Sequence, residues 1–212
     1  MPDVGIVVLA AGGSTRMGRP KQLLPIAGQS MLLRAASAAV ESGCKPAIVV
    51  LGAQAELLRP ELSGIPVSIA VNETWHRGIG SSIRCGIGAL MTSASTRGAV
   101  VILLCDQPFV SAEVIRRLVS AHAGSGKPIC VSAFNGTFGP PVVVDSRYFD
   151  LLLSLPDDQG AKALWACRQE QVHFEPCAEA GTDIDTPGDY ERWEIQAVSP
   201  LRRDSGGGYF GW

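Results

Sequence analysis

Residues 4–21, VGIVVLAAGGSTRMGRPK, contain an apolar run followed by a cationic loop with glycines, and this stretch decides the fold. The run from Val4 to Leu9 is rich in β-branched residues and does not alternate with polar ones, which is typical of a strand buried on both faces. It therefore predicts a central parallel strand. Residues 10–14 (AAGGS) are small enough to turn sharply and to bring backbone N–H groups close to a bulky anion. The stretch as a whole predicts a strand that leads into a phosphate-binding loop.

The loop also carries three cations, Arg16, Arg19 and Lys21, at a density that neither a turn nor a core requires. A Walker-type loop needs Lys and then Ser or Thr directly after its second glycine. Here Gly18 is followed by Arg19 and Pro20, which excludes that loop.

A dinucleotide-binding loop needs G-x-G-x-x-G at the start of a helix. In this chain Gly12 and Gly13 are adjacent, and Pro20 and Pro25 prevent a helix before about Ser30. What remains is a long cationic loop suited to wrapping a triphosphate.

The chain has 212 residues, enough for one sizeable α/β domain. Its net charge is −2, with 18 Lys and Arg against 20 Asp and Glu, so we expect small-molecule partners and neither nucleic acid nor a membrane surface. The apolar run at the N-terminus is too short to span a bilayer and has no basic region before it. We expect a cytoplasmic protein.

The six cysteines are scattered and include no C-x-x-C pair, which argues against a zinc or redox motif. We expect reduced, mostly buried thiols at Cys44, Cys85, Cys105, Cys130, Cys167 and Cys177.

Further along the chain, predicted strands and helices alternate, which indicates right-handed βαβ crossovers and a largely parallel sheet with ligands at the carboxyl ends of its strands. Strands are predicted at 47–51, 67–71, 99–104 and 128–131. Helices are predicted from the cap Ser30 to Gly43, around 55–58, at 112–122 and at 161–167. Ser30 and Ser111 are the predicted caps of two of these helices. Residues 134–144 (FNGTFGPPVVV) predict a turn and an extended segment whose prolines indicate a sheet edge or a strand start.

Residues 72–90 (NETWHRGIGSSIRCGIGAL) predict a glycine-rich loop running into a helix. In a functional interpretation Gly80, Ser81 and Ser82 contact a base or ribose, and Arg84 reaches a phosphate. In a structural interpretation the serines cap the helix and the glycines allow tight packing. The residues alone leave both open.

Two acidic segments are candidate metal sites. Asp106 follows the buried strand 99–104 directly, where its carboxylate faces the ligand crevice; since Ser111 already caps the next helix, we predict Asp106 to be a Mg²⁺ ligand. Residues 182–190 (TDIDTPGDY) predict a short strand that runs into a helix with Thr186 as cap and Pro187 in its first turn. Asp183 and Asp185 lie on one face of that strand, a pair that needs a nearby cation. Residues 1–198 are expected to form the domain, and the glycine-rich residues 199–212 a mobile tail.

Residues 9–32, LAAGGSTRMGRPKQLLPIAGQSML, resemble the signature of the nucleotidyltransferases that build the dinucleotide form of the molybdenum cofactor. That family implies a single Rossmann-like α/β domain of the nucleotide-diphospho-sugar transferase type. Alanine at position 11 resembles the cytidylyltransferase branch more than the guanylyltransferase branch. The nucleotide-binding residues implied by the resemblance are Leu9, Ala10, Ala11, Gly12, Gly13, Ser14, Arg16, Lys21, Gly80, Ser81 and Ser82.

The resemblance also assigns later residues. C-D-Q-P at 105–108 is similar to the family's metal-binding motif, and D-I-D-T-P at 183–187 implies Asp185 as the second metal ligand, with Asp183 undecided. An acceptor pocket is implied at Gly139, Pro140, Asp158 and Lys162, although Asp157 stands where the family has a glycine. For Gly139 and Pro140 the alternative is a rigid turn. For Asp158 the alternative is a helix cap, with Lys162 exposed to solvent.

The resulting hypothesis is a Mg²⁺- or Mn²⁺-dependent enzyme in which Arg16, Lys21 and Asp106 are catalytic. The terminal phosphate of the molybdopterin cofactor would attack the α-phosphate of CTP and release pyrophosphate. The alternatives are GTP as donor, a sugar or isoprenoid phosphate as acceptor, a chaperone that inserts molybdenum cofactor into a molybdenum hydroxylase apoenzyme, and a Rossmann oxidoreductase.

Overall fold

The structure, a computed structural model, describes residues 3–93, 98–166 and 168–198. The predicted tail at 199–212 and Cys167 lie outside these residues. The strands are β1 (Val4–Ala10), β2 (Pro25–Ile26), β3 (Gln29–Ser30), β4 (Ala47–Leu51), β5 (Ser68–Val71), β6 (Ala99–Leu104), β7 (Ile129–Phe134), β8 (Thr137–Asp145) and β9 (Val172–Pro176). The helices are α1 (Met31–Glu41), α2 (Ala55–Leu58), α3 (Ile79–Thr92), α4 (Ala112–Ser125), α5 (Phe149–Leu153), α6 (Lys162–Ala166) and α7 (Pro187–Val198).

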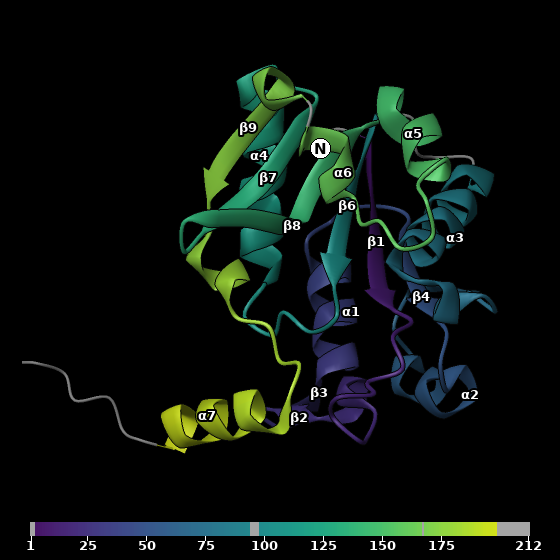
Figure 1. Cartoon of the computed structure of the whole chain (residues 1–212), viewed down its shortest axis with the longest axis vertical. Helices are drawn as coiled ribbons and strands as arrows, with labels where there is room; N and C mark the ends of the chain where they lie inside the picture. The colour runs from purple at the N-terminus through teal and green to yellow at the C-terminus, as the bar shows by residue number, and fades with distance from the viewer. Residues whose placement is uncertain (1–2, 94–97, 167, 199–212) are drawn as a thin grey trace, which may run out of the picture.

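A seven-stranded sheet in the order β5-β4-β1-β6-β8-β7-β9 forms the centre of the molecule (Figure 1). β1 pairs in parallel with both β4 and β6, and β4 pairs in parallel with β5. Only β8 runs antiparallel to its two neighbours within this sheet. The predicted fold class, a mostly parallel sheet flanked by helices, is confirmed.

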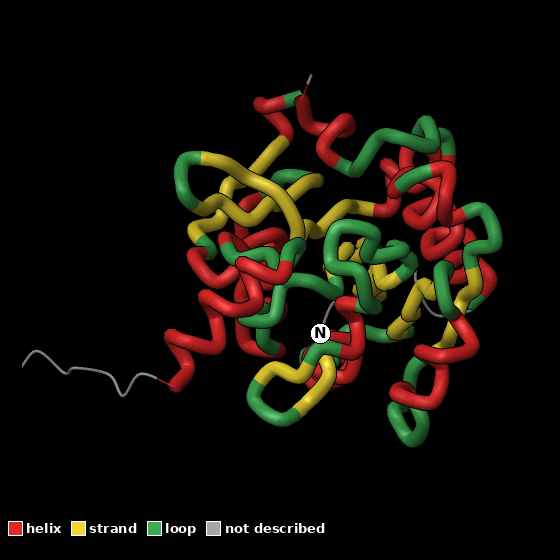
Figure 2. The backbone as a smooth tube through the Cα atoms, turned by 60° about the horizontal axis from the view of Figure 1, so that its bottom comes forward, coloured by secondary structure: helices red, strands yellow, loops and turns green. Residues whose placement is uncertain are grey.

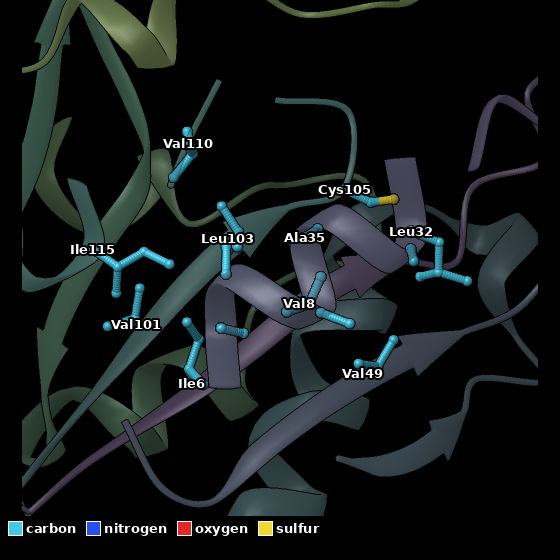
Figure 3. Packing of buried hydrophobic residues seen from close by; sticks show 14 of the residues in the cluster. Ile6, Val8, Leu32, Ala35, Val49, Val101, Leu103, Cys105, Val110 and Ile115 are labelled. Carbon is cyan, nitrogen blue, oxygen red and sulfur yellow. The ribbon is translucent and has the colours of Figure 1, made fainter. Parts of the chain in front are cut away.

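Helices cover both faces of the sheet, because alternate side chains of each buried strand point to opposite faces. Ile6 and Val8 of β1 are fully buried with α1 and α4, where they meet residues such as Leu32 and Ile115 (Figure 3). Val7 faces the second core, which is formed with α3, α5 and α6. Each such side chain contributes about 1.5–3 kcal/mol on burial, so β1 is fixed from two sides.

The predicted helix caps at Ser30 and Ser111 are confirmed. The Ser30 hydroxyl accepts a hydrogen bond from the backbone N–H of Leu33 at 3.2 Å, and Ser111 does the same for Val114 at 3.4 Å. Each bond satisfies a backbone N–H group that has no partner within its helix. The caps therefore fix where α1 and α4 begin.

Three sequence-based expectations about secondary structure need correction. Pro140 and Pro141 lie within β8, which has a strand on each side, and they sit where its pairing with β7 shifts register, so no ladder hydrogen bond is required of them. Residues 182–185 form no strand. Third, the structure contains two short elements, β9 and α5, that the sequence analysis did not predict.

The carboxyl ends of β1 and β6 lie side by side at one edge of the sheet, because the two strands are adjacent and parallel. Figure 2 turns this edge toward the viewer and shows the loops gathered there. α7 lies beyond the same edge next to β2 and β3, where the Tyr190 hydroxyl donates to the Pro25 carbonyl at 2.9 Å (Figure 1). Among the described residues, no helix combines the length and apolar character needed to cross a membrane.

Candidate active site

The loop after β1 is held in shape by one buried side chain, that of Gln22. Its Nε2 donates to the carbonyls of Ala10 at 3.1 Å and Gly12 at 2.7 Å, while its Oε1 accepts from the Ser14 hydroxyl at 3.0 Å. Ser14 Oγ in turn accepts from the backbone N–H of Lys21 at 3.0 Å. These hydrogen bonds therefore hold the loop in shape before any ligand binds. Sequence reasoning missed Gln22, since no spacing pattern distinguishes it from neighbouring polar residues.

Two cations and two carboxylates meet beside this loop. Lys21 Nζ lies 2.6 Å from Asp106 Oδ2 and 2.6 Å from Asp185 Oδ1. Arg16 Nη2 lies 2.9 Å from Asp185 Oδ2. Lys21 and Asp106 are mostly buried, with side chains 16% and 18% exposed, so solvent screens their attraction only weakly. Residues that are far apart in the sequence therefore form one charged centre.

The charges at this centre shift the pKa values of its members. Burial disfavours the Lys21 ammonium, but the charges and hydrogen bonds of Asp106 and Asp185 outweigh it and raise the pKa of Lys21. Burial likewise opposes ionisation of Asp185, yet Lys21 and Arg16 lower its pKa. The pKa of Asp183 is raised to about 6, first by burial and then by the nearby Asp106 and Asp185. Lys21 and Asp185 are therefore both charged at neutral pH.

A pocket of about 360 Å³ opens between the loop after β1 and the start of α3. Its lining comprises Leu9, Ala10, Ala11, Gly12, Gly13, Thr15, Lys21, Gln22, Trp75, His76, Gly78, Ile79, Ser82, Leu104, Cys105 and Asp106. Backbone, apolar side chains and a cation thus face one cavity, a lining that suits a nucleotide. We name it the nucleotide pocket, after the ligand that the sequence analysis predicted for this loop.

Trp75 forms one wall of the nucleotide pocket, a role that the sequence analysis did not assign to it. A Cβ on Gly13 would lie 2.9 Å from the Trp75 ring, and a Cβ on Gly52 would lie 2.6 Å from Trp75 Cβ. The lack of a side chain at Gly13 and Gly52 therefore leaves room for the Trp75 side chain. The signal that could have found Trp75 is a large aromatic residue directly before the glycine-rich segment.

The residues predicted to bind nucleotide at the start of α3 have protein partners instead. The Gly80 N–H donates to the Asp157 carbonyl at 2.8 Å. The Ser81 hydroxyl is buried, donates to the Gly78 carbonyl at 2.7 Å and accepts from Asn72 Nδ2 at 2.8 Å. Ser82 also accepts from Asn72, at 3.0 Å, but lines the nucleotide pocket. Of the three, only Ser82 faces the cavity.

Arg84 does not reach the phosphate region, contrary to the functional interpretation. Its guanidinium donates to the Leu155 carbonyl and to the carboxylate of Asp157, which also pairs with Arg77 at 2.6 Å. Hydrogen bonding by Arg84 lowers the pKa of Asp157 more than the other influences do. In this structure Arg84 therefore ties the loop before α6 to α3.

The four predicted acceptor residues come from β8 and from the segment that leads into α6, and Lys162 lies beside β8. Gly139 and Pro140 belong to β8, and the Pro140 carbonyl accepts from Gln107 Nε2 at 2.9 Å. Asp158 and Lys162 are exposed, and Lys162 Nζ lies 5.1 Å from the centre of the Phe138 ring. None of these four is part of the lining of the nucleotide pocket.

The carboxylates of this centre suit a divalent cation. Asp106 Oδ1 is buried and has no hydrogen-bond partner among the described residues, although an unpaired buried carboxylate oxygen is costly. The described residues contain no group of three or more His, Cys, Asp or Glu placed to hold a metal. Mg²⁺ and Mn²⁺ accept one or two carboxylates when phosphate oxygens and water complete the coordination. The donor set fits an ion that binds together with a nucleotide.

The fold and this centre together define a class of protein: an α/β enzyme that binds a nucleoside polyphosphate at the carboxyl edge of a parallel sheet. The model of the MobA-like NTP transferase domain matches residues 6–173. This chain therefore belongs to the MobA-like NTP transferase family and is a nucleotidyltransferase, and the family resemblance seen in the sequence is confirmed.

Individual relatives cover nearly the whole chain. Nicotine blue oxidoreductase of Paenarthrobacter nicotinovorans is 32% identical over 197 residues, which are 88% of this chain and 94% of that protein. The crystal structure of the Mycobacterium tuberculosis Rv0371c homologue from Mycobacterium sp. strain JC1 matches with a TM-score of 0.78 and 30% identity, covering 92% of this chain and 97% of that one. The crystal structure of Rv0371c from Mycobacterium tuberculosis H37Rv in complex with manganese matches with a TM-score of 0.72 and 28% identity, covering 90% of this chain and 97% of that one.

Proposed function

We propose that this protein transfers CMP from CTP to the terminal phosphate of the molybdopterin cofactor and releases pyrophosphate, with Mg²⁺ or Mn²⁺ as cofactor. One observation carries the proposal: Lys21 and Arg16 meet Asp106 and Asp185 beside the nucleotide pocket. Such a centre can neutralise a triphosphate and hold a divalent ion at the same place. The cytoplasm is the proposed compartment.

In this mechanism the chain mainly positions and neutralises phosphates, as in other phosphoryl transfers. The loop held by Gln22 presents backbone N–H groups to the triphosphate. Lys21 and Arg16 stabilise the charge that develops on the α-phosphate and on the leaving pyrophosphate. No general base is needed, because a phosphate nucleophile is already ionised at neutral pH.

Asp106 and Asp185 would hold the divalent ion. When bound, such an ion supplies Lewis-acid polarisation of the α-phosphate. Manganese in the complex of Rv0371c, a protein 28% identical to this one, supports this part of the proposal. Since Lys21 Nζ bridges the same two carboxylates, its release toward the phosphates accompanies nucleotide binding.

The choice of CTP rests on Ala11 in the first loop and is the part of the proposal that experiment should address first. GTP as donor, or a sugar or isoprenoid phosphate as acceptor, would use the same charged centre. The test is pyrophosphate release with each of the four NTPs and purified molybdopterin cofactor. Release with CTP alone supports the proposal; release with GTP alone, or only with another acceptor, refutes the substrate assignment.

A second candidate function is a pyridine-nucleotide-dependent reductase, because the relative from Paenarthrobacter nicotinovorans carries the name of an oxidoreductase. The loop after β1 lacks the G-x-G-x-x-G spacing that dinucleotide binding requires. Thermal unfolding with and without NADPH distinguishes the two, since a ligand of the folded state raises the melting temperature. Stabilisation by CTP and Mg²⁺ but not by NADPH is the expected result.

A further inference from the structure

The segment that carries Asp185 has no regular secondary structure, so its position depends on individual hydrogen bonds. Residues 182–185 form neither helix nor strand. Downstream, Asp189 Oδ2, in the first turn of α7, accepts from the Thr186 N–H at 2.8 Å, just before the helix begins at Pro187. Upstream, the Ile184 N–H donates to the Asp106 carbonyl at 3.1 Å. The first contact fixes where the segment ends, and the second ties it to the turn after β6.

Gln107 provides a third connection, which consists of two side-chain hydrogen bonds. Its side chain is buried, with 4% of the residue exposed. Nε2 donates to the carbonyl of Pro140 at 2.9 Å and to the carbonyl of Ala180 at 3.0 Å. Both partners can only accept, so they fix which end of the amide is the nitrogen. One side chain thus joins the end of β6, the register shift of β8 and the 3₁₀ turn that precedes Asp185.

We propose that Gln107 is a positioning residue that sets the distance between the carboxylates of Asp106 and Asp185. Gln107 follows Asp106 directly in the chain. Its bond to Ala180 therefore ties the turn that carries Asp106 to the residues just before the Asp185 segment. Movement of the 182–185 segment away from this turn would break the bond to Ala180 before it separated the carboxylates. The inference rests on the proposed function, because it concerns the metal site of that reaction.

Gln22 offers a built-in comparison. It is also a buried glutamine that directly follows a charged residue of the centre, and its Nε2 also donates to two backbone carbonyls. Its contacts, however, lie within the loop after β1 and do not touch the Asp185 segment. The same substitution at Gln22 and Gln107 therefore separates a general effect of losing a buried amide from an effect on the carboxylate pair.

The experiment uses Gln107→Met, which keeps the length of the side chain and removes the donor. Mn²⁺ binding in the presence of CTP, without an acceptor, is followed by electron paramagnetic resonance, and kcat and KM are measured separately with saturating metal. Loss of a hydrogen-bond partner of a metal ligand costs about 10- to 100-fold in metal affinity or activity. Because Gln107 donates to the Pro140 and Ala180 carbonyls and not to either carboxylate, we expect a loss at the lower end, about 10-fold, in Mn²⁺ affinity and in kcat, with the KM for CTP changed little.

Two controls keep the test decisive. Gln22→Met should weaken CTP binding, while Mn²⁺ affinity measured at a CTP concentration that saturates this variant stays at the wild-type value. Val119→Ala, in the core between α1 and α4, supplies a loss of stability at a distance from the centre. Gln107→Leu, which also lacks a donor and adds no charge beside the carboxylates, repeats the measurement if Gln107→Met is unfolded at the assay temperature.

The proposal is overturned if the Gln107 variants bind Mn²⁺ as wild type does, or if Gln22→Met or Val119→Ala weakens Mn²⁺ binding equally. Failure of the proposed function looks different: wild-type protein would then release no pyrophosphate from any NTP. The Mn²⁺ measurement involves no turnover, so it retains its meaning in that case.

Discussion

Gly80→Ala should destabilise the protein although alanine favours helices. A Cβ at this position of α3 would lie 1.9 Å from the Pro156 carbonyl oxygen and 2.9 Å from that of Gln159. Real Cβ atoms essentially never approach another atom closer than 3.0 Å. Because the obstructing atoms belong to the backbone, no side-chain rotation relieves the contact. The loop at 156–159 must therefore move away from α3.

The expected magnitude follows from three contributions. Overpacking a tight site costs about 1–3 kcal/mol. Loss of the hydrogen bond from the Gly80 N–H to Asp157 adds about 0.5–1.5 kcal/mol. Alanine returns at most about 1 kcal/mol of helix propensity. We expect a net loss of about 0.5–3.5 kcal/mol in the free energy of unfolding, or about 2–4 °C in melting temperature for each kcal/mol in a chain of this size.

Gly88→Ala, in the same helix, is the matched control. A Cβ on Gly88 would have nothing within 4 Å. Only the propensity contribution remains, so this variant should be more stable than wild type by up to about 1 kcal/mol. Both variants are compared by urea denaturation followed by circular dichroism. CTP affinity, measured by calorimetry, should fall only for Gly80→Ala, because its displaced loop adjoins the start of α3.

The outcome that refutes this reasoning is a Gly80→Ala protein as stable as Gly88→Ala, with unchanged CTP affinity. The loop at 156–159 would then be able to shift at no cost. The close approach of the two segments would have no bearing on the nucleotide pocket.

Three further predictions concern the charged centre. Lys21→Met leaves Asp106 without its cation and Asp185 with Arg16 alone among the described residues, so the variant should melt at lower temperature than wild type and bind Mn²⁺ at least as tightly, while kcat falls by orders of magnitude; weaker Mn²⁺ binding would contradict the role given to Lys21. Asp106→Asn should keep the circular dichroism spectrum and lose kcat by orders of magnitude; near-normal kcat at saturating Mg²⁺ would remove Asp106 from the mechanism. The pKa of Asp183 is raised to about 6, chiefly by burial, so the folded state binds this proton more tightly than the unfolded state and ionised Asp183 is destabilising. Asp183→Asn should therefore be more stable than wild type above pH 6, an advantage that shrinks as the pH falls toward about 4; a difference between the two proteins that does not change with pH would refute this.

Local interactions explain what the sequence determined correctly. Residues 4–9 predict a strand buried on both faces because the run is apolar and β-branched throughout, and β1 has both faces buried. Ser30 and Ser111 predict helix starts because their hydroxyls reach backbone N–H groups only a few residues away. The cationic loop and Asp106 were found because each directly follows a buried strand.

Contacts between distant segments explain what the sequence could not determine. Arg84 carries the same charge in any environment, and only the packing of α3 against the loop at 156–159 gives it Asp157 as partner. Gln22 and Gln107 are ordinary polar residues in the sequence, and their roles depend on which carbonyls the fold brings within reach. Asp185 was predicted on a strand that does not form.

The sequence by itself therefore determined the strand, the loop, the helix caps and the chemical types at the site, because each depends on neighbours along the chain. The tertiary structure alone decided which charges pair and which glycines leave space for another segment. A side chain's partner across the sheet edge is fixed by how the strands and helices pack, and the spacing of residues along the chain does not record that packing.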